Sequence, residues 1–468
     1  PVLFNLIILS KRDKKKLFIA GLSFGFGFFS SSLYWISNSL RFDESFQILI
    51  PISIILIPLI ISFFYAICFV FLSFFKTNYN ISSLVLFALL ISLCDYLRGN
   101  MFSGFPWNLV AFSIYNFEYS LQLLSIVGTY TFNLLVISLY LSPAIIFLNI
   151  DYKIKFISYI FIFLFLMTNN IYGFKKIERF ANLNHNNLEN KIYIVSPKIE
   201  LNRYFSGENM INIIRDIIKI SNPDKKIQTL FIFPEGILAG INFNDLKNYK
   251  KFFYENFSEN HKIILGINTE ENYKIFNSLI LLNNKLEIIS QYNKNNLVPF
   301  GEYLPFENII LKTGLKKITQ GYNSFSSSQK RNTIKIGEYD FLPLICYEII
   351  YTGKLNNKLK NIDFIVNISE DGWFGNSIGP TQHFVHSIYR AIEEGKNIFR
   401  SSNNGISAHI NPTGVVEKSI NSTQSGVIIV EYVKLTDKTL FAKWGNKIFF
   451  YFLIIYITFI FFLKKKNL

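Results

Sequence analysis

The interpretation of this chain depends on residues 341–348, which read Phe341-Leu342-Pro343-Leu344-Ile345-Cys346-Tyr347-Glu348. An apolar run ends there at one cysteine, followed by a tyrosine and a carboxylate. A strand that ends at a thiol can present a nucleophile, because the strand holds the residue rigidly while the turn exposes the sulfur. Taken alone, the pattern is more typical of a buried structural cysteine. The other segments of the chain distinguish these two interpretations.

The composition indicates a membrane protein with a sizeable polar part. The chain has 468 residues, of which 50% are hydrophobic and 17% aromatic, and its mean hydropathy is +0.28. These values are too apolar for a wholly soluble protein, and the length allows two or three domains. The first residue is Pro1 and the first apolar run, 2–9, is short. We therefore expect the chain to be truncated at its N-terminus.

The charge and the cysteine count argue against several classes of function. The formal charge is +15, but no DNA- or RNA-binding motif accompanies it, so we expect no nucleic-acid partner. Three cysteines, Cys68, Cys94 and Cys346, cannot build a disulfide framework. Cys68 and Cys94 lie inside apolar runs, where core or lipid-facing positions are expected. The five histidines show no metal-ligand spacing, so no metal site is predicted.

Long apolar stretches predict transmembrane helices within residues 1–172, with a partial span before residue 10. A helix of about 20 apolar residues is long enough to cross a bilayer. The predicted spans lie at 17–37, 46–75, 81–98, 120–148 and 156–172, and a sixth lies at 446–463. Between the fifth and sixth spans, residues 173–445 form one polar region, and residues 464–468 form a basic tail.

The distribution of lysine and arginine predicts how these spans are oriented. Basic residues gather in cytoplasmic loops, and the segments 11–16 and 464–466 are both basic. If both lie in the cytoplasm, then 46–75 is a single span. The same count of crossings places residues 173–445 on the other side of the membrane, as one extracytoplasmic domain.

Residues 173–445 predict a layered α/β domain. Short β-type runs alternate with polar helical stretches, of which 208–220 is an amphipathic helix. The predicted strands lie at 191–195, 229–233, 262–267, 276–283, 286–292, 340–346, 362–368, 405–410 and 426–431. Strands with intervening helices in a region of this length favour sheets that are covered by helices.

Three predicted strand ends finish in ionisable residues of different kinds. Glu235 follows 229–233, Lys294 follows 286–292, and Cys346 ends 340–346. A thiol with a pKa of about 8.5 is mostly protonated at neutral pH, so a carboxylate is needed as its base. Glu235 would be that base, and then the acid for the leaving group. Lys294 and the backbone N–H after Cys346 would stabilise the oxyanion, an effect typically worth about 3–4 kcal/mol.

Several motifs in the same order resemble a known family. Residues 233–236, 292–305 and 345–348 look like the Glu-Lys-Cys signatures of the nitrilase superfamily. More narrowly, the chain resembles the apolipoprotein N-acyltransferases. That narrower resemblance is carried by Leu297-Val298-Pro299-Phe300-Gly301-Glu302-Tyr303, by 371–380 with Gln382-His383, by Arg400-Ser401 with Asn403-Asn404-Gly405-Ile406, and in the membrane part by Leu97-Arg98-Gly99 and Gly104-Phe105-Pro106-Trp107. It covers nearly the whole chain.

The resemblance implies a fold and a two-step reaction. The fold is a nitrilase-like α-β-β-α sandwich that faces the periplasm from the bacterial inner (plasma) membrane. Cys346 would attack an ester of a membrane phospholipid, giving a thioester and a lysophospholipid. The α-amine of the diacylglyceryl-cysteine of an apolipoprotein would then take the acyl chain. Glu235, Lys294 and Cys346 match the catalytic triad of the family, and no metal or cofactor is implied.

The resemblance also assigns supporting residues. Glu302, Tyr347 and Glu348 match supporting active-site positions of the family. Trp373, within Asp371-Gly372-Trp373-Phe374-Gly375, either lines the acyl pocket or fills the core beside a glycine turn. Aromatic and apolar residues near the lysine segment could form a lip for acyl chains: Phe300, Tyr303, Leu304 and Phe306. The serine-rich stretch 321–330 is expected to be a mobile loop, in the manner of a lid.

Other matched residues are expected to be structural. His383 follows a helix start and, with Glu235 assigned as base, is expected to be a hydrogen-bonded structural histidine. Asn404-Gly405 before a strand is a hairpin signal. Arg98 and Trp107 are expected to anchor the chain at a membrane boundary.

The chain departs from the family pattern at two positions. After the first strand of the polar region the family has a segment that ends in Lys-Trp, whereas this chain has 195–205 with Phe205 at the tryptophan position. The aromatic ring is kept there but the indole N–H is lost, in a loop expected to meet the substrate. Glu370 stands where asparagine is usual.

Two other functions were weighed against acyl transfer. A membrane-tethered nitrilase-type amidase that hydrolyses a small amide would use the same three residues, with water in place of the amine. The apolar lip and the spans favour a lipid substrate. A transporter is disfavoured, because the spans carry few ionisable residues apart from Asp95 and Arg98.

Overall fold

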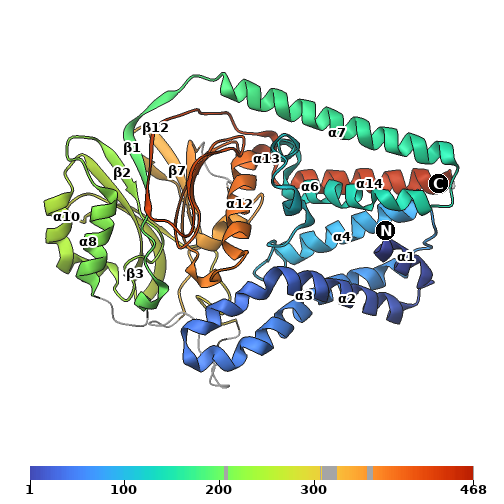
Figure 1. The fold of residues 1–468 in the computed structure, drawn as a ribbon, viewed down its shortest axis with the longest axis horizontal. Helices are drawn as coiled ribbons and strands as arrows, with labels where there is room; N and C mark the ends of the chain where they lie inside the picture. Colours follow the sequence, from blue (N-terminus) through green and yellow to red (C-terminus); the bar gives the residue numbers. More distant parts are fainter. Residues whose placement is uncertain (205–208, 306, 308–323, 356–361, 467–468) are drawn as a thin grey trace.

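The structure is a computed structural model that describes residues 1–204, 209–305, 307, 324–355 and 362–466. Figure 1 shows long helices on one side and a layered α/β part on the other, joined through the helix α12 (Gly379–Glu394). We call residues 1–181 with the last helix the bundle, and residues 186–433 the sandwich.

The bundle contains helices that are long and apolar enough to cross a membrane. Six such helices occur among the described residues. The helical segments of the bundle are α1 (Val2–Leu9), α2 (Lys14–Leu33), η1 (Tyr34–Phe42), η2 (Glu44–Leu49), α3 (Ile50–Leu72), α4 (Ile81–Asn100), η3 (Val110–Ile114), α5 (Glu118–Leu121), α6 (Leu124–Leu141), η4 (Ser142–Phe147), α7 (Tyr152–Ala181) and α14 (Lys447–Lys465). Helix α7 continues nine residues past the predicted end at 172.

The outer helices of the bundle present apolar side chains that no part of the described chain covers. On α7, Phe156, Ile157 and Phe161 are each more than 60% exposed. Such a surface is unfavourable in water but suits the hydrocarbon of a bilayer. Cys68 and Cys94 instead lie in the bundle core, where each thiol donates to a backbone carbonyl, of Leu90 and Phe64. The chain is therefore a membrane protein.

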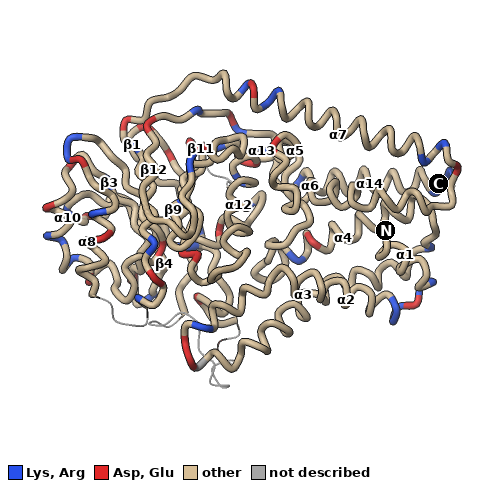
Figure 2. The backbone as a smooth tube through the Cα atoms, viewed as in Figure 1, with Lys and Arg blue, Asp and Glu red and all other residues tan. Residues whose placement is uncertain are grey.

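Two basic segments of the bundle, 11–16 and 464–466, lie at the end of the helices away from the sandwich (Figure 2). The loop at 73–80 contacts each of them. Arg12 donates to the carbonyl of Ser73 (3.1 Å), and the Lys464 ammonium lies 5.7 Å from the ring of Phe75. Asn149 N donates to the carbonyl of Tyr79 (2.8 Å). One end of the bundle is thus basic, whereas the other packs on the sandwich.

The sandwich consists of two six-stranded sheets. The first has the order β12-β1-β2-β3-β4-β5 and the second β11-β10-β9-β8-β7-β6. The strands are β1 (Asn186–Ser196), β2 (Thr229–Ile232), β3 (His261–Glu271), β4 (Lys274–Leu282), β5 (Ile288–Asn293), β6 (Ile334–Ile336), β7 (Tyr339–Ile345), β8 (Phe364–Glu370), β9 (Asn397–Asn403), β10 (Ser407–Ile410), β11 (Val416–Ile420) and β12 (Gly426–Val433). In the centres of the sheets, β1, β2 and β3 are parallel, as are β7, β8 and β9.

Helices cover the outer face of each sheet, which confirms the α-β-β-α order expected from the sequence. Apolar side chains of both sheets fill the space between them, including Ile194, Ile232, Ile345 and Ile368. The outer face of the first sheet packs on α8 (Met210–Ser221) and α10 (Lys250–Asn256). The outer face of the second sheet packs on α12, and α12 packs in turn on the bundle.

The sequence missed three strands, all in the second sheet. Strand β9 (Asn397–Asn403) is central and fully buried, yet its sequence Asn-Ile-Phe-Arg-Ser-Ser-Asn is mostly polar. Its Arg400 is paired with Asp371 (2.8 Å) and also donates to Asn367 Oδ1. A strand whose buried polar groups find partners on the neighbouring strand has no apolar pattern to detect. Strands β6 and β11 are short edge strands.

The joint between bundle and sandwich includes a broken helix. In α6, Gly128 has φ 72° and ψ 171°, a conformation essentially limited to glycine. The break frees the backbone N–H of Thr129, which donates to Glu393 Oε1 of α12 (2.6 Å). A Cβ at Gly128 would lie 1.9 Å from the ring of Phe441, on α13 (Leu440–Trp444). Glycine is needed there on both counts.

We expect Gly128→Ala to destabilise the protein by about 2–4 kcal/mol, because the left-handed backbone and the clash with Phe441 act together. Thermal unfolding in detergent measures this as a melting temperature lower by several degrees. The matched control is Gly27→Ala on α2, where a Cβ would meet nothing within 4 Å. Equal melting temperatures for the two variants would contradict this account of the joint.

Candidate active site

Cys346 lies at the end of β7, on the first residue of the short helix η8 (Cys346–Ile350). Its backbone has φ +49°, a left-handed conformation that is strained for any residue with a Cβ. The side chain is half-buried. The strand that the sequence predicted therefore does deliver the thiol to a sharp turn, where it stays accessible.

Glu235 and Lys294 extend from the first sheet towards the same place. Glu235 follows β2, and Lys294 follows β5. The Lys294 ammonium is buried and lies 3.2 Å from Glu235 Oε1 and 2.9 Å from Glu302 Oε1. Burial by itself lowers the pKa of Lys294, but the two carboxylates outweigh it and hold that pKa well above its usual value. The side chain is therefore a permanent cation.

Asn277, which the sequence did not single out, joins the two carboxylates. It lies on β4, and its Nδ2 donates to Glu235 Oε1 and to Glu302 Oε1, at 2.7 Å each. The other oxygen of Glu235 accepts from the backbone N–H of Glu370 (3.1 Å), and that of Glu302 from Val298 N (2.8 Å). The sequence offered only a weak signal for Asn277, an amide next to Ser278 in a strand that is apolar from Leu279 to Leu282.

The thiol of Cys346 is protonated at neutral pH. Burial raises its pKa well above the usual value, the charge of Glu235 raises it further, and Lys294 opposes both. A thiol in this state needs a base before it can react. Lys294 lies 3.2 Å from Glu235, and the chain neighbours of Lys294 and Cys346, Asn295 and Ile345, both donate to Glu348. The structure therefore brings the three predicted residues into one cluster.

Glu348 connects the cysteine turn with the lysine segment. Its Oε1 accepts from Tyr292 Oη (2.8 Å) and from the backbone N–H groups of Asn295 and Asn296 (3.0 and 3.1 Å). Its Oε2 accepts from Ile345 N (2.9 Å), directly before Cys346. Glu348 is fully buried, with Arg331 3.3 Å away as its counter-ion. It holds the two sheets together at the site.

Tyr347 connects the cysteine turn with the bundle. Its hydroxyl donates to the carbonyl of Gly104 (2.9 Å), and that of Tyr351 donates to the carbonyl of Ser103 (2.9 Å). Both carbonyls belong to the loop between α4 and η3, residues 101–109, which we call the α4–η3 loop. Tyr347 therefore joins the bundle to the turn at Cys346. We call this turn the nucleophile turn, because Cys346 is the predicted nucleophile.

His383 is buried behind the nucleophile. Its Nδ1 lies 2.9 Å from Asp371 Oδ1, and its Nε2 lies 3.3 Å from the carbonyl oxygen of Cys346. Burial lowers the pKa of His383, so the ring is neutral at pH 7. The expectation that His383 is hydrogen-bonded is confirmed, and its structural role stays a prediction. The hairpin signal is confirmed as well, because Asn404 (φ 54°) connects the antiparallel strands β9 and β10.

The membrane-anchor expectation for Arg98 and Trp107 is wrong. Both are buried, with 3% of each side chain exposed. Trp107 stacks on His383, with ring centroids 5.3 Å apart, and its Nε1 donates to Gln382 Oε1 (2.8 Å). Motif and span position placed these residues near a boundary. Trp107 instead belongs to the contact between bundle and sandwich, and Arg98 lies inside the bundle, 3.1 Å from Asp95.

At Glu370, where the family has asparagine, the extra negative charge is neutralised by a positively charged side chain. Glu370 forms a buried ion pair with Arg203 on η5 (Leu201–Tyr204), and Arg203 also donates to the carbonyl of Gly236 (3.1 Å). Because Glu370 N donates to Glu235, both residues of this ion pair bind the segment that carries Glu235. Phe205, the other departure, lies outside the described residues. The ring of Trp373 is half-buried between Phe42 of η1 and Tyr204.

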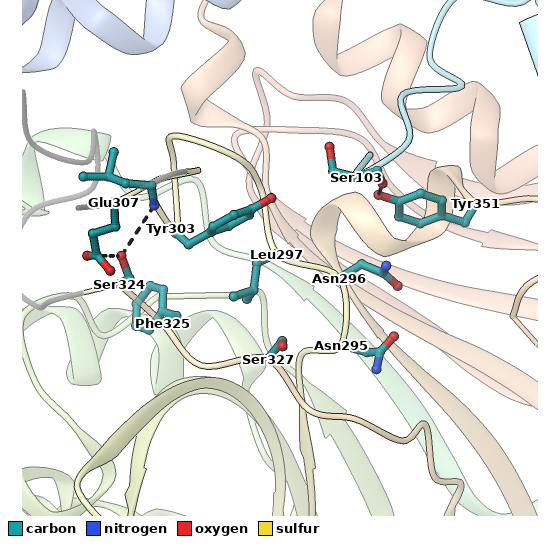
Figure 3. Close-up of a pocket in the computed structure, with 11 residues that line it drawn as sticks. Ser103, Asn295, Asn296, Leu297, Tyr303, Glu307, Ser324, Phe325, Ser327 and Tyr351 are labelled. Atoms are coloured by element: carbon teal, nitrogen blue, oxygen red, sulfur yellow. Dashed lines mark hydrogen bonds between the residues drawn. The ribbon is translucent and has the colours of Figure 1, made fainter. Parts of the chain in front are cut away.

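A pocket of about 420 Å³ adjoins the cluster (Figure 3). It lies between the α4–η3 loop, the segment after Lys294 and the chain at 324–327. Its lining residues are Ser103, Asn295, Asn296, Leu297, Tyr303, Leu304, Glu307, Ser324, Phe325, Ser327 and Tyr351. Tyr303 and Leu304 of the expected lip thus line it, Phe300 is 51% exposed, and Phe306 lies outside the described residues.

The expected lid is described only in part, because residues 321–323 lie outside the described residues. The described part of it runs along the segments that carry Lys294 and Glu302. Phe325 N donates to the carbonyl of Glu302 and Ser328 N to the carbonyl of Lys294, at 2.9 Å each. Among the described residues, no group of three His, Cys, Asp or Glu side chains is placed to hold a metal ion.

Known proteins match the chain over both of its parts. The family model of the apolipoprotein N-acyltransferase N-terminal domain matches residues 1–141, and that of the carbon–nitrogen hydrolases matches 229–437. Apolipoprotein N-acyltransferase of Rickettsia prowazekii is 30% identical over 91% of this chain and 85% of its own length. That of Rhizobium meliloti is 26% identical over 87% and 78%.

Among solved structures, the chain is similar to an amidase from Nesterenkonia sp. AN1. The match covers 53% of this chain and 92% of that one, at 11% identity and a TM-score of 0.38. The similarity to the acyltransferases extends over the bundle as well as the sandwich. The chain therefore belongs to the apolipoprotein N-acyltransferase family of membrane-bound acyltransferases, with a carbon–nitrogen hydrolase domain as its catalytic part.

Proposed function

We propose that this enzyme transfers an acyl chain from a membrane phospholipid to the α-amine of a diacylglyceryl-cysteine at the N-terminus of an apolipoprotein, through a thioester on Cys346. The observation that carries the proposal is the cluster in which a buried Lys294–Glu235 pair acts on a protonated, accessible thiol. The names of the relatives supply the acceptor class.

In the first step, Glu235 takes the proton of the Cys346 thiol while the sulfur attacks the ester carbonyl of the phospholipid. Negative charge develops on the carbonyl oxygen, where the Lys294 ammonium stabilises it. The C–O bond then breaks, and Glu235 returns the proton to the departing lysophospholipid oxygen. The products are a thioester and a lysophospholipid.

In the second step, the amine of the acceptor attacks the thioester carbonyl. Glu235 takes a proton from the amine, Lys294 again stabilises the oxyanion, and the thiolate leaves. The proton on Glu235 then restores the thiol. A water molecule in the place of the amine would give hydrolysis, which is the amidase-type alternative.

The position of the cluster suits substrates that cannot leave a bilayer. The nucleophile turn bonds to the α4–η3 loop of the bundle, so the thiol is held next to the end of the membrane helices. Confinement of enzyme and lipid to one membrane raises the effective concentration of the substrate. The pocket beside Lys294 offers room for the part of the phospholipid that surrounds the scissile ester.

The basic end of the bundle supports an orientation with the sandwich in the periplasm. Lysine and arginine gather on the cytoplasmic side of inner-membrane proteins, and the basic segments here share the end away from the sandwich (Figure 2). On this proposal, the reaction takes place at the outer surface of the inner membrane.

We expect a fatty-acyl adduct on Cys346 when purified protein is incubated with phospholipid, detected by mass spectrometry. The adduct should disappear when a diacylated lipopeptide is added, and the peptide should gain the acyl chain. Cys346→Ser should form no thioester, and Lys294→Ala should slow acylation at least about 100-fold, as the loss of an oxyanion donor does.

The matched control for the lysine is Lys191→Ala, because Lys191 pairs with Glu431 on the surface of the sandwich. It should acylate at the wild-type rate. If wild-type protein binds phospholipid but forms no adduct, the proposal is wrong. Loss of the adduct to water, without transfer to the peptide, would favour the amidase instead.

We expect Glu235→Gln to shift the pH profile of Cys346 alkylation by iodoacetamide to lower pH. Only the thiolate reacts, and the substitution removes a charge that raises the pKa of Cys346 but leaves Lys294, which lowers it. The variant should therefore be alkylated faster at neutral pH, although acyl transfer is lost. Peptide mass spectrometry measures the rate at residue 346 alone.

The exposed carboxylate of Glu287 provides the control for this pH profile. Glu287→Gln should leave the alkylation profile unchanged. A profile for Glu235→Gln that coincides with the wild type, or that moves to higher pH, would mean that Glu235 does not act on the thiol.

We expect a cysteine at position 273 to react with a membrane-impermeant maleimide in cells whose inner membrane is intact. Tyr273 is 99% exposed in the turn between β3 and β4. In a Cys346→Ala background, Tyr273→Cys should be labelled at once, whereas Lys465→Cys should be labelled only after lysis. The reverse pattern would overturn the orientation.

A further inference from the structure

The apolar bundle contains a buried ion pair that the reaction chemistry does not use. Asp95 and Arg98, both on α4, are 0% and 3% exposed, and Arg98 Nη2 lies 3.1 Å from Asp95 Oδ1. Asp95 also accepts from Tyr65 Oη and Asn133 Nδ2, at 2.9 Å each. Ionisable side chains are costly in membrane helices and usually serve a function.

The remaining donors of Arg98 hold the α4–η3 loop. Nη1 donates to the carbonyl of Phe105 (2.5 Å), and Nη2 donates to the carbonyl of Asn108 (3.1 Å). A planar guanidinium can hold two carbonyls and a carboxylate in one fixed geometry, which an ammonium cannot do. The ion pair therefore sets the shape of the loop on both sides of Trp107.

The same loop is connected with the nucleophile turn in two ways, one direct and one through His383. The carbonyl of Gly104 accepts from Tyr347 Oη (2.9 Å), next to Cys346 in the chain. The ring of Trp107 stacks on His383, whose Nε2 lies 3.3 Å from the carbonyl oxygen of Cys346. Arg98 is thus linked to Cys346 by two short paths through one loop.

These contacts act on a residue whose backbone conformation needs support. Cys346 has φ +49°, and such strain persists only where the surroundings impose it. A nucleophile displaced by about 1 Å can lose about 100-fold in rate. We propose that the Asp95–Arg98 pair is a positioning device that sets the geometry of Cys346 through the α4–η3 loop. This inference rests on the proposed role of Cys346 as the acylated nucleophile.

The test measures single-turnover acylation of Cys346 by phospholipid in Arg98→Lys. This variant keeps the charge opposite Asp95 but loses the fork that holds the two carbonyls. We expect the acylation rate at saturating lipid to fall about tenfold or more, within the loss that misplacement causes, with an unchanged lipid concentration at half-maximal rate.

A matched control separates positioning from stability. Gln122 is also buried and links bundle to sandwich, since its Nε2 donates to the carbonyls of Glu118 (3.0 Å) and Thr413 (2.8 Å). Among the described residues, neither of these acceptors belongs to the α4–η3 loop or to the nucleophile turn. Gln122→Leu should lower the melting temperature about as much as Arg98→Lys and still acylate at the wild-type rate.

A double-mutant cycle tests the path itself. Tyr347→Phe removes the bond to Gly104, so in the Arg98→Lys background it should add little to the loss of rate. If the two effects multiply, or if Arg98→Lys acylates at the wild-type rate, the inference is wrong. Should Arg98→Lys fail to fold, Asp95→Asn takes its place in the cycle. A wild-type protein without adduct would instead refute the proposed function.

Discussion

The buried ammonium of Lys294 is the constraint on which the rest of the site depends. A charge out of contact with water is tolerated only when it is paired and hydrogen-bonded. Here two carboxylates, Glu235 and Glu302, lie within 3.2 Å and 2.9 Å of it, and Asn277 joins both. These four residues come from or follow β2, β4 and β5, so the sheet must bring those strands together before the charge can be buried. In the proposed mechanism, the same pairing keeps the cation in place for the oxyanion.

The nucleophile turn is the second point at which separate parts of the molecule meet. Glu348 ties it to the lysine segment, Tyr347 ties it to the bundle, and His383 ties it to α12. A left-handed cysteine is unfavourable by itself, so these contacts from different elements maintain it. The thiol is consequently positioned by the membrane part as well as by its own sheet. This arrangement suits an enzyme whose substrates stay in the bilayer.

Much of the architecture could be predicted, because it follows from local patterns. Apolar length marked the spans, and a β-type run followed by an ionisable residue marked the ends of β2, β5 and β7. Strand β9 escaped notice because its buried polar groups are satisfied by residues distant in the chain, such as Arg400 by Asp371. Asn277 was missed for a similar reason, because its partners Glu235 and Glu302 are distant in the chain. Arg98 and Trp107 were predicted at a lipid boundary, but both are buried.

The chain's own order of residues was sufficient to predict the spans from their apolar length. It also predicted the sandwich and the grouping of Glu235, Lys294 and Cys346, but only because several motifs occur together in the order of a known family. The folded arrangement alone showed how these groups are held. Three contacts join residues far apart in sequence: the ion pair of Arg203 with Glu370, the hydrogen bond of Asn295 to Glu348, and the hydrogen bond of Tyr347 to the loop that Arg98 holds. Such pairings depend on which strands and helices become neighbours, and a local pattern carries no information about a distant partner.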